Sequence, residues 1–220
     1  MGKEPMTKVD PHSRPVTSGD FAYAALTNAI VTGELEADSR IVQADWAEKL
    51  GVSVTPLREA IRRLQADGMV KQVPHKGATV VGLRRDEAEE IYSLREILEP
   101  KLVAPAIEAI TPQIHEVALA LCNDMSNTTD PTLFSELNTK FHSCLTDTVS
   151  GWTARLAYTL RMAAAPYVNL TLRQFPEQMQ SSNQEHFELL EAYDSRDVEK
   201  AKTVAVRHLR SSLSLLRKCL

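Results

Sequence analysis

A chain of 220 residues with 43% hydrophobic and 25% charged residues has the composition of a globular protein, which excludes a chain that is disordered throughout. Its apolar runs are shorter than the roughly 20 residues that a membrane-spanning helix needs, so we expect no membrane span. The formal net charge of −4 argues mildly against a nucleic-acid partner, but the basic residues are unevenly distributed along the chain.

Two features of the sequence favour a cytoplasmic protein. Residues 1–18 combine charge with proline and lack the apolar stretch of a secretory signal, which predicts a flexible N-terminal arm. The cysteines, Cys122, Cys144 and Cys219, are odd in number and far apart, and this spacing is typical of neither a disulfide framework nor a metal knuckle. We therefore expect them to be reduced thiols.

Residues 19–83 show the element order of a winged helix-turn-helix domain. Segments with apolar residues at helical spacing end at glycines, and two β-rich segments around a turn follow them. The predicted elements are helices over 21–33, 43–50 and 54–67 and strands over 69–73 and 78–81. Ser53 is expected to cap the third helix.

This third helix and the hairpin after it have the composition of a DNA-reading surface. Between Ser53 and Arg85, seven Lys or Arg residues stand against two acids. Short polar groups let the start of a recognition helix approach the major groove, and arginines reach phosphates or guanine edges. Arginines on an isolated helix usually do no more than solvate it, but the preceding helix-turn and the basic hairpin favour DNA contact. The predicted DNA-binding residues are Ser53, Thr55, Arg58, Arg62, His75, Lys76 and Gly77.

The run LGVSVTPLREAI, residues 50–61, together with Gly68 and Gly77, resembles the GntR family of bacterial transcription regulators. The resemblance implies a winged helix-turn-helix that binds operator DNA. Family members usually carry arginine at the position of Val54, and in relatives that arginine often helps to bind DNA. We therefore expect this chain to differ from them in the bases it reads and in how tightly it binds.

From residue 84 to residue 220 the pattern changes to helices only, with glycine almost absent after Gly82. The predicted helices cover 86–99, 101–110, 112–126, 131–149, 152–165, 182–194 and 197–218. The expected fold class is therefore mainly α, with the winged helix-turn-helix followed by an antiparallel all-α bundle of six or seven helices.

Four polar residues lie in apolar helical settings of this second part: Asn138, His142, His186 and His208. A lone histidine beside core positions is more often structural than a ligand. However, His186 and His208 lie eleven residues on either side of Asp197, which puts them level in an antiparallel helix pair, and the other two are one turn apart. Three imidazoles and an oxygen donor suit zinc, nickel or manganese. The alternative is a polar pocket in which the same residues bind a ligand without an ion.

Residues 86–216 resemble the FCD ligand-binding domain of the FadR branch of the GntR family. The matching segments are Leu94–Glu99, Asn138–His142, Glu185–His186 and Arg207–Leu209. In that family the histidines bind a metal that often helps to hold an organic acid. Asn138 stands where aspartate is common, so the site should carry one less negative charge and bind metal less tightly.

The resemblance also implies an effector-binding arginine on the first helix of the bundle, here Arg95, whose guanidinium can fork onto a carboxylate. The alternative for Arg95 is a solvated ion pair with Glu99 on the helix surface. Arg161 is a second effector-binding candidate, and Arg173 a further one. Glu185, next to His186, is expected to point elsewhere because adjacent residues lie about 100° apart around a helix.

The sequence thus favours a DNA-binding regulator, most commonly a repressor in this family, that is not an enzyme. Its expected partners are double-stranded operator DNA, a carboxylate effector and a second copy of the chain, with no membrane. Two subunits would place their recognition helices on half-sites about one DNA turn apart. The competing hypothesis is a metal-dependent helical enzyme that uses the asparagine and histidine cluster, and it would need an acid or base beside the metal.

Overall fold

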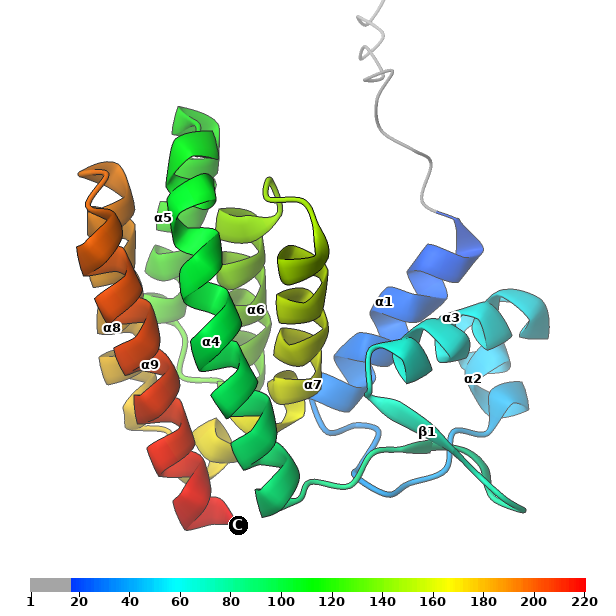
Figure 1. Ribbon diagram of the computed structural model, residues 1–220. Coiled ribbons are helices and arrows are strands. Elements are labelled where there is room, and N and C mark those ends of the chain that lie inside the picture. Colours follow the sequence, from blue (N-terminus) through cyan, green and yellow to red (C-terminus); the bar gives the residue numbers. More distant parts are fainter. Residues whose placement is uncertain (1–16) are drawn as a thin grey trace, which may run out of the picture.

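Residues 17–220 are described by the computed structural model, and they form a small winged domain beside a helical bundle (Figure 1). The winged domain consists of α1 (Ser18–Val31), α2 (Gln43–Leu50), α3 (Val54–Ala66), β1 (Val70–Val73) and β2 (Gly77–Val80). The bundle consists of α4 (Arg85–Ala109), α5 (Pro112–Asn127), α6 (Pro131–Thr146), α7 (Trp152–Gln174), α8 (Gln178–Asp194) and α9 (Val198–Cys219). This order confirms the predicted fold class.

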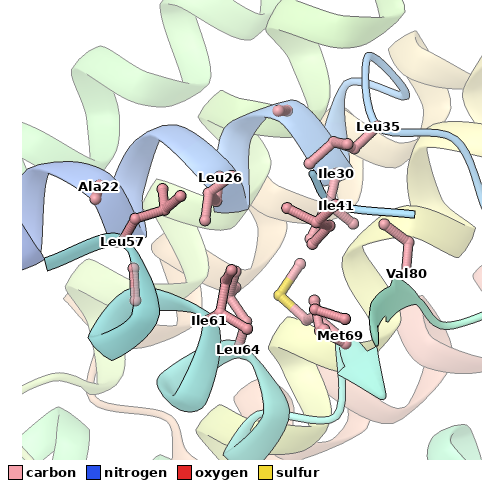
Figure 2. Packing of buried hydrophobic residues seen from close by; sticks show 14 of the residues in the cluster. Ala22, Leu26, Ile30, Leu35, Ile41, Leu57, Ile61, Leu64, Met69 and Val80 are labelled. Atoms are coloured by element: carbon pink, nitrogen blue, oxygen red, sulfur yellow. The ribbon is translucent and has the colours of Figure 1, made fainter. Parts of the chain in front are cut away.

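One apolar core holds the winged domain together (Figure 2). Leu26 of α1 packs with Leu57 and Leu64 of α3, and all three side chains are fully buried. Met69 and Val80 from the hairpin complete the same core. Because the apolar stripe of α3 faces α1, the opposite face of this helix is left for solvent or a partner.

The hairpin is a two-stranded antiparallel sheet closed by a tight turn. Val70 lies opposite Val80, and the Lys76 N–H donates to the Val73 carbonyl at 3.1 Å. In the turn from Val73 to Lys76, Pro74 occupies the second position, and His75 at the third position has a φ of +64°. These features describe a type II turn, whose third position favours glycine.

Two predicted helix boundaries at prolines are wrong. We expected separate helices over 86–99 and 101–110, but α4 runs through both Pro100 and Pro105. Similarly α7 continues through Pro166 instead of ending at residue 165. An internal proline costs a helix about 3 kcal/mol. The packing of α4 along α7 and α9 offsets this cost, and the described residues therefore contain a six-helix bundle.

The predicted arm, residues 1–18, lies outside the described residues as far as residue 16. Of its last two residues, Ser18 begins α1 and Thr17 caps this helix, because the Thr17 hydroxyl accepts from the Asp20 N–H. No helix within residues 17–220 combines the length and the apolar character that a bilayer crossing requires. The three cysteines are free thiols.

Helix α7 connects the two parts of the molecule. Met162 and Ala165 of α7 are buried in the core of the winged domain. One turn further along α7, the Asn169 amide donates to the Val31 carbonyl, and after one more turn the Arg173 guanidinium donates to the Thr32 carbonyl. These bonds satisfy carbonyl groups that the end of α1 would otherwise leave without partners. Figure 1 shows α7 at the side of the bundle that faces α1.

Candidate functional site

The first two turns of α3 are exposed on the side away from the core. Ser53, Thr55, Arg58 and Arg62 are all exposed. Ser53 occupies the N-cap position, but its hydroxyl makes no capping bond. The Arg58 Nε donates to the Gln43 Oε1 at 3.1 Å, which orients this guanidinium toward the start of α2. The predicted contact residues of α3 therefore share one accessible polar surface.

The remaining arginine of α3 has a different role. Arg63 is paired with Asp20 of α1 at 2.7 Å, and its guanidinium lies 4.0 Å from the centre of the Tyr23 ring. This contact ties α3 to α1 at the surface of the winged domain. Arg63 therefore already has an acidic partner within the winged domain.

The tip of the hairpin supplies the second part of the predicted DNA-binding surface. His75 and Lys76 are exposed, and Gly77 is half-buried with a φ of +79°. The hairpin extends away from the bundle (Figure 1). A basic tip on an extended arm can reach phosphates or a minor groove beside the recognition helix.

Three histidines from three different helices meet inside the bundle. His142 lies on α6, His186 on α8 and His208 on α9, and all three are buried. Their ring centroids are 4.8 to 5.2 Å apart. One ring nitrogen from each histidine lies within 4.8 Å of the others. The structure thus brings together the three predicted imidazole ligands.

Two of these rings present nitrogen atoms that are buried without a partner. Within residues 17–220, the Nε2 atoms of His142 and His186 are both buried and form no hydrogen bond. Burial, followed by the charges of the neighbouring histidines, lowers the pKa of both rings well below 6.5. Metal ligation requires neutral imidazoles. An orphaned buried nitrogen costs about 1–3 kcal/mol, and a divalent cation between the rings would remove that cost, so these residues fit a metal.

Two further side chains orient the histidines. The Nδ1 of His208 lies 2.8 Å from the Glu185 Oε2, and the Nδ1 of His186 lies 3.3 Å from the Asn183 Oδ1. Asn183 is itself fixed, because its amide donates to the Cys122 carbonyl and the Ser126 hydroxyl, each at 2.9 Å. Such outer partners hold the opposite ring nitrogen, Nε2, toward a bound ion.

The prediction for Glu185 was wrong, and the role of Asn183 was not predicted. We expected Glu185 to point elsewhere, but it contacts His208 and lines the cavity beside it. Burial alone would raise the pKa of Glu185, but the hydrogen bonds and charges of His208, Ser211 and Arg207 together outweigh it, so the pKa falls below the ordinary value. Asn183 precedes His186 by one turn of α8, and this spacing is the signal that could have identified it.

The fourth predicted ligand, Asn138, lies one turn before His142 on the wall of a cavity of about 300 Å³. This cavity, the larger of the two that His142 and His208 line, also borders Arg95. It lies between the bundle helices, and the buried side chains of Arg95, His142 and His208 form its inner end. Three of the four predicted ligands, Asn138, His142 and His208, therefore share one space with Arg95, while His186 does not line it.

Arg95 forms the ion pair with Glu99 that we considered as its alternative role, but the pair is buried and not solvated. The Arg95 Nε donates to the Glu99 Oε1 at 2.7 Å, and the two side chains are 5% and 12% exposed. Arg161 approaches the same oxygen at 4.0 Å and donates to the Thr146 hydroxyl at 3.0 Å. One carboxylate thus faces two buried guanidiniums.

The electrostatics of this trio favour an anion. Burial alone would raise the pKa of Glu99, but the charges of Arg95 and Arg161 hold it below its ordinary value. Burial also lowers the pKa of Arg161, whose Nε has no partner within residues 17–220. Arg161 borders a second, smaller cavity of about 30 Å³ that it shares with His142 and His208. Arg173, by contrast, binds the end of α1 and lies outside both cavities.

Comparison with known proteins finds two family models. The model "Bacterial regulatory proteins, gntR family" matches residues 19–80, and the FCD domain model matches residues 90–211. The transcriptional regulator YdhC of Bacillus subtilis (strain 168) is 32% identical over 133 residues, 57% of this chain and 58% of YdhC. A regulator from Agrobacterium vitis is 35% identical over 103 residues, 47% of this chain and 60% of its own. These matches therefore span less than two thirds of either relative.

Longer matches come from a repressor and from solved structures. The transcriptional repressor GlaR of Escherichia coli (strain K12) is 24% identical over 216 residues, 93% of this chain and 98% of GlaR. The structure of E. coli McbR/YncC superposes with a TM-score of 0.80 at 22% identity and covers 93% of this chain and 99% of its own. A regulator structure from Rhodococcus sp. RHA1 gives 0.71 at 18% identity, with 92% and 98% covered. These structures share the fold.

Proposed function

Because the chain belongs to the gntR family of bacterial regulatory proteins and carries an FCD domain of the FadR-like branch, it is a transcription regulator, and we propose that it is a homodimeric repressor controlled by a small organic acid. It acts in the cytoplasm, where its operator DNA is. The observation that carries the effector proposal is the buried cluster of three histidines with unpartnered nitrogens, set beside a cavity that Arg95 also borders.

In this proposal His142, His186, His208 and Asn138 hold a zinc, nickel or manganese ion. When bound, the ion supplies an electrophilic coordination position for one carboxylate of the effector. Arg95 provides the fork of donors for the same group, and the excess of guanidinium over carboxylate charge around Glu99 adds attraction for an anion. Glu185 and Asn183 keep the histidine rings in the orientation that ligation needs.

DNA binding is proposed to use α3 and the hairpin tip, with Arg58 as the principal reader of base edges or phosphates. Two copies are required because each recognition helix covers only one half-site. Exposed apolar side chains on α4 and α7 support self-association, among them Ile97 at 59% and Trp152 at 73% exposure. Repression is favoured by the nearly full-length similarity to the repressor GlaR.

The metal-dependent enzyme is the weaker candidate. Glu185 is the carboxylate closest to the histidines, and it already accepts from His208 and Ser211 and pairs with Arg207 at 3.4 Å. Its lowered pKa does not suit a general acid. In this arrangement Glu185 positions a ligand and has no free proton to transfer.

A gel shift with DNA from upstream of the protein's own gene tests the DNA-binding proposal. Arg58→Ala should weaken specific binding about tenfold or more, since a good arginine contact contributes about 1–3 kcal/mol. Lys218→Ala, an exposed basic residue at the far end of α9, is the matched control and should bind like the wild type. Operator affinity unchanged in Arg58→Ala, with helicity retained in both variants, would refute the assignment of α3.

Elemental analysis of protein purified without chelator or added metal tests the metal site. The wild type should hold an ion that His186→Ala loses, and Asn138→Asp should hold it more tightly because a carboxylate is a stronger ligand than an amide. If neither the wild type nor Asn138→Asp ever holds stoichiometric metal, the metal part of the proposal is wrong. Direct binding of an organic acid to the metal-free pocket would then be the remaining mechanism.

A further inference from the structure

The larger cavity carries more hydroxyl groups than the anchoring of a carboxylate requires. Arg95 and the histidines are sufficient to hold one acid group at its inner end. The hydroxyl-bearing residues along the remainder of its wall are Tyr92, Thr171, Ser181, Ser182, Ser211, Ser212 and Ser214. Gln178 and Asn138 add two amides. The chemistry of this wall therefore describes the part of the effector beyond its carboxylate.

The residues that line the cavity differ in how deeply they are buried. The inner end is buried, with Arg95 at 4% and His208 at 8% exposure. The serines of α8 and α9 line the outer part, where Ser182 and Ser212 are half-buried and the others are exposed. A molecule whose acid group lies at the inner end would thus extend outward between two serine-bearing helices. Apolar side chains border the cavity on α7 and α9, as Val168, Leu172, Leu209 and Leu215, and the ring of Tyr92 adds apolar surface on α4.

The serine hydroxyls differ in whether the protein itself satisfies them. The Ser181 hydroxyl donates to the Gln178 carbonyl, and the Ser211 hydroxyl donates to Glu185. Among the described residues, the hydroxyls of Ser182, Ser212 and Ser214 form no hydrogen bond, and of these Ser182 and Ser212 are the half-buried ones that a ligand would engage. An alkyl chain in this space would desolvate them without replacing their hydrogen bonds, which is unfavourable. A chain with its own hydroxyls would exchange one set of hydrogen bonds for another.

We infer that the effector is a polyhydroxylated carboxylic acid, and this inference rests on the proposed function for the anchoring of its acid group. A cavity of about 300 Å³ has room for roughly ten non-hydrogen atoms, at about 30 Å³ for each water-sized group. That size corresponds to a chain of about four or five carbons with hydroxyl groups along it. Apolar acids of the same length fill the space but leave the serine-bearing wall unused.

Calorimetry on the full chain with matched pairs of acids tests the inference. The pairs differ only in hydroxyl groups: tartrate with succinate, and threonate with butanoate. At least one hydroxylated acid should bind tenfold or more tightly than its partner. If the acids without hydroxyls bind equally well or better, the inference is wrong while the carboxylate sensor stands. If no acid of either kind binds, both the inference and the organic-acid proposal are wrong.

Serine variants separate hydrogen bonding from the mere small size of serine. The double substitution Ser182→Ala with Ser212→Ala should weaken the best hydroxylated acid about tenfold and leave its hydroxyl-free partner unchanged, because net hydrogen bonds contribute about 0.5–1.5 kcal/mol each. Ser93→Ala is the matched control, an exposed serine on α4 that bonds only to the Glu90 carbonyl. An equal loss for both acids, or no loss for either, would overturn the role of these hydroxyls.

Discussion

Glu99 is the single carboxylate between two buried guanidiniums, and its removal should strongly destabilise the bundle. In Glu99→Gln, Arg95 loses its 2.7 Å partner and Arg161 loses the carboxylate that lies 4.0 Å from its Nε. Removing one partner of a buried ion pair typically costs about 3–5 kcal/mol, because the remaining charge is left uncompensated. Both arginines are less than a tenth exposed, so solvent screening should not reduce this cost greatly. The expected loss in the free energy of unfolding is therefore about 3–5 kcal/mol.

Urea denaturation at one fixed protein concentration measures this loss, since the stability of a dimer depends on concentration. Glu96→Gln is the matched control on the same helix. Glu96 pairs at 2.9 Å with Arg210, whose side chain is 68% exposed. An exposed pair contributes about 0–1 kcal/mol. If Glu99→Gln loses no more stability than Glu96→Gln, the buried trio does not carry the energy assigned to it.

Three further predictions follow from single features of the structure. With chelator present, the free energy of unfolding should fall as pH drops below 6.5, by up to about 1.4 kcal/mol per imidazole for each pH unit. The reason is that His142 and His186 stay neutral in the folded state and take up protons only on unfolding. Urea titrations at pH 7 and 5.5 measure this change, and the dependence on pH should be flatter when both histidines are replaced by Phe. Asn183→Ala should weaken metal binding about 10- to 100-fold by freeing the His186 ring, and an unchanged affinity in a chelator competition would contradict the orienting role. His75→Gly should raise thermal stability by about 1 kcal/mol by relieving the left-handed turn position, whereas a lower melting temperature would show that the histidine side chain stabilises the turn.

The parts of the fold that the sequence predicted are those decided by local pattern. The apolar stripe of α3 and the glycine stops define the winged domain, and each of these signals acts within one or two helical turns. The histidine cluster was also accessible from spacing, because His186 and His208 lie equally far from the turn between two antiparallel helices. Symmetry about a short turn is a local property even when the contact is distant in sequence.

The features that the sequence missed depend on tertiary packing. Proline at position 100 is a local stop signal, and only the packing of α4 against two other helices overrides it. The burial of Arg95 was equally hidden, since the i, i+4 pair with Glu99 has the same pattern on a surface as in a core. The fixing of Asn183 by the Cys122 carbonyl requires α5 to lie beside α8, which no pattern within α8 encodes.

Helix α7 gives the molecule a physical connection between its buried polar centre and its DNA-binding part. Arg161 and Met162 are adjacent in this helix, but the first faces Glu99 and the second is buried in the core of the winged domain. Beyond them the Asn169 amide is bonded to the end of α1. Because a helix is stiff along its axis and both cores are closely packed, a displacement of Arg161 along that axis displaces the groups that hold α1. The recognition helix α3 packs on α1, so a continuous series of direct contacts joins the Arg161–Glu99 pair to the DNA-binding surface.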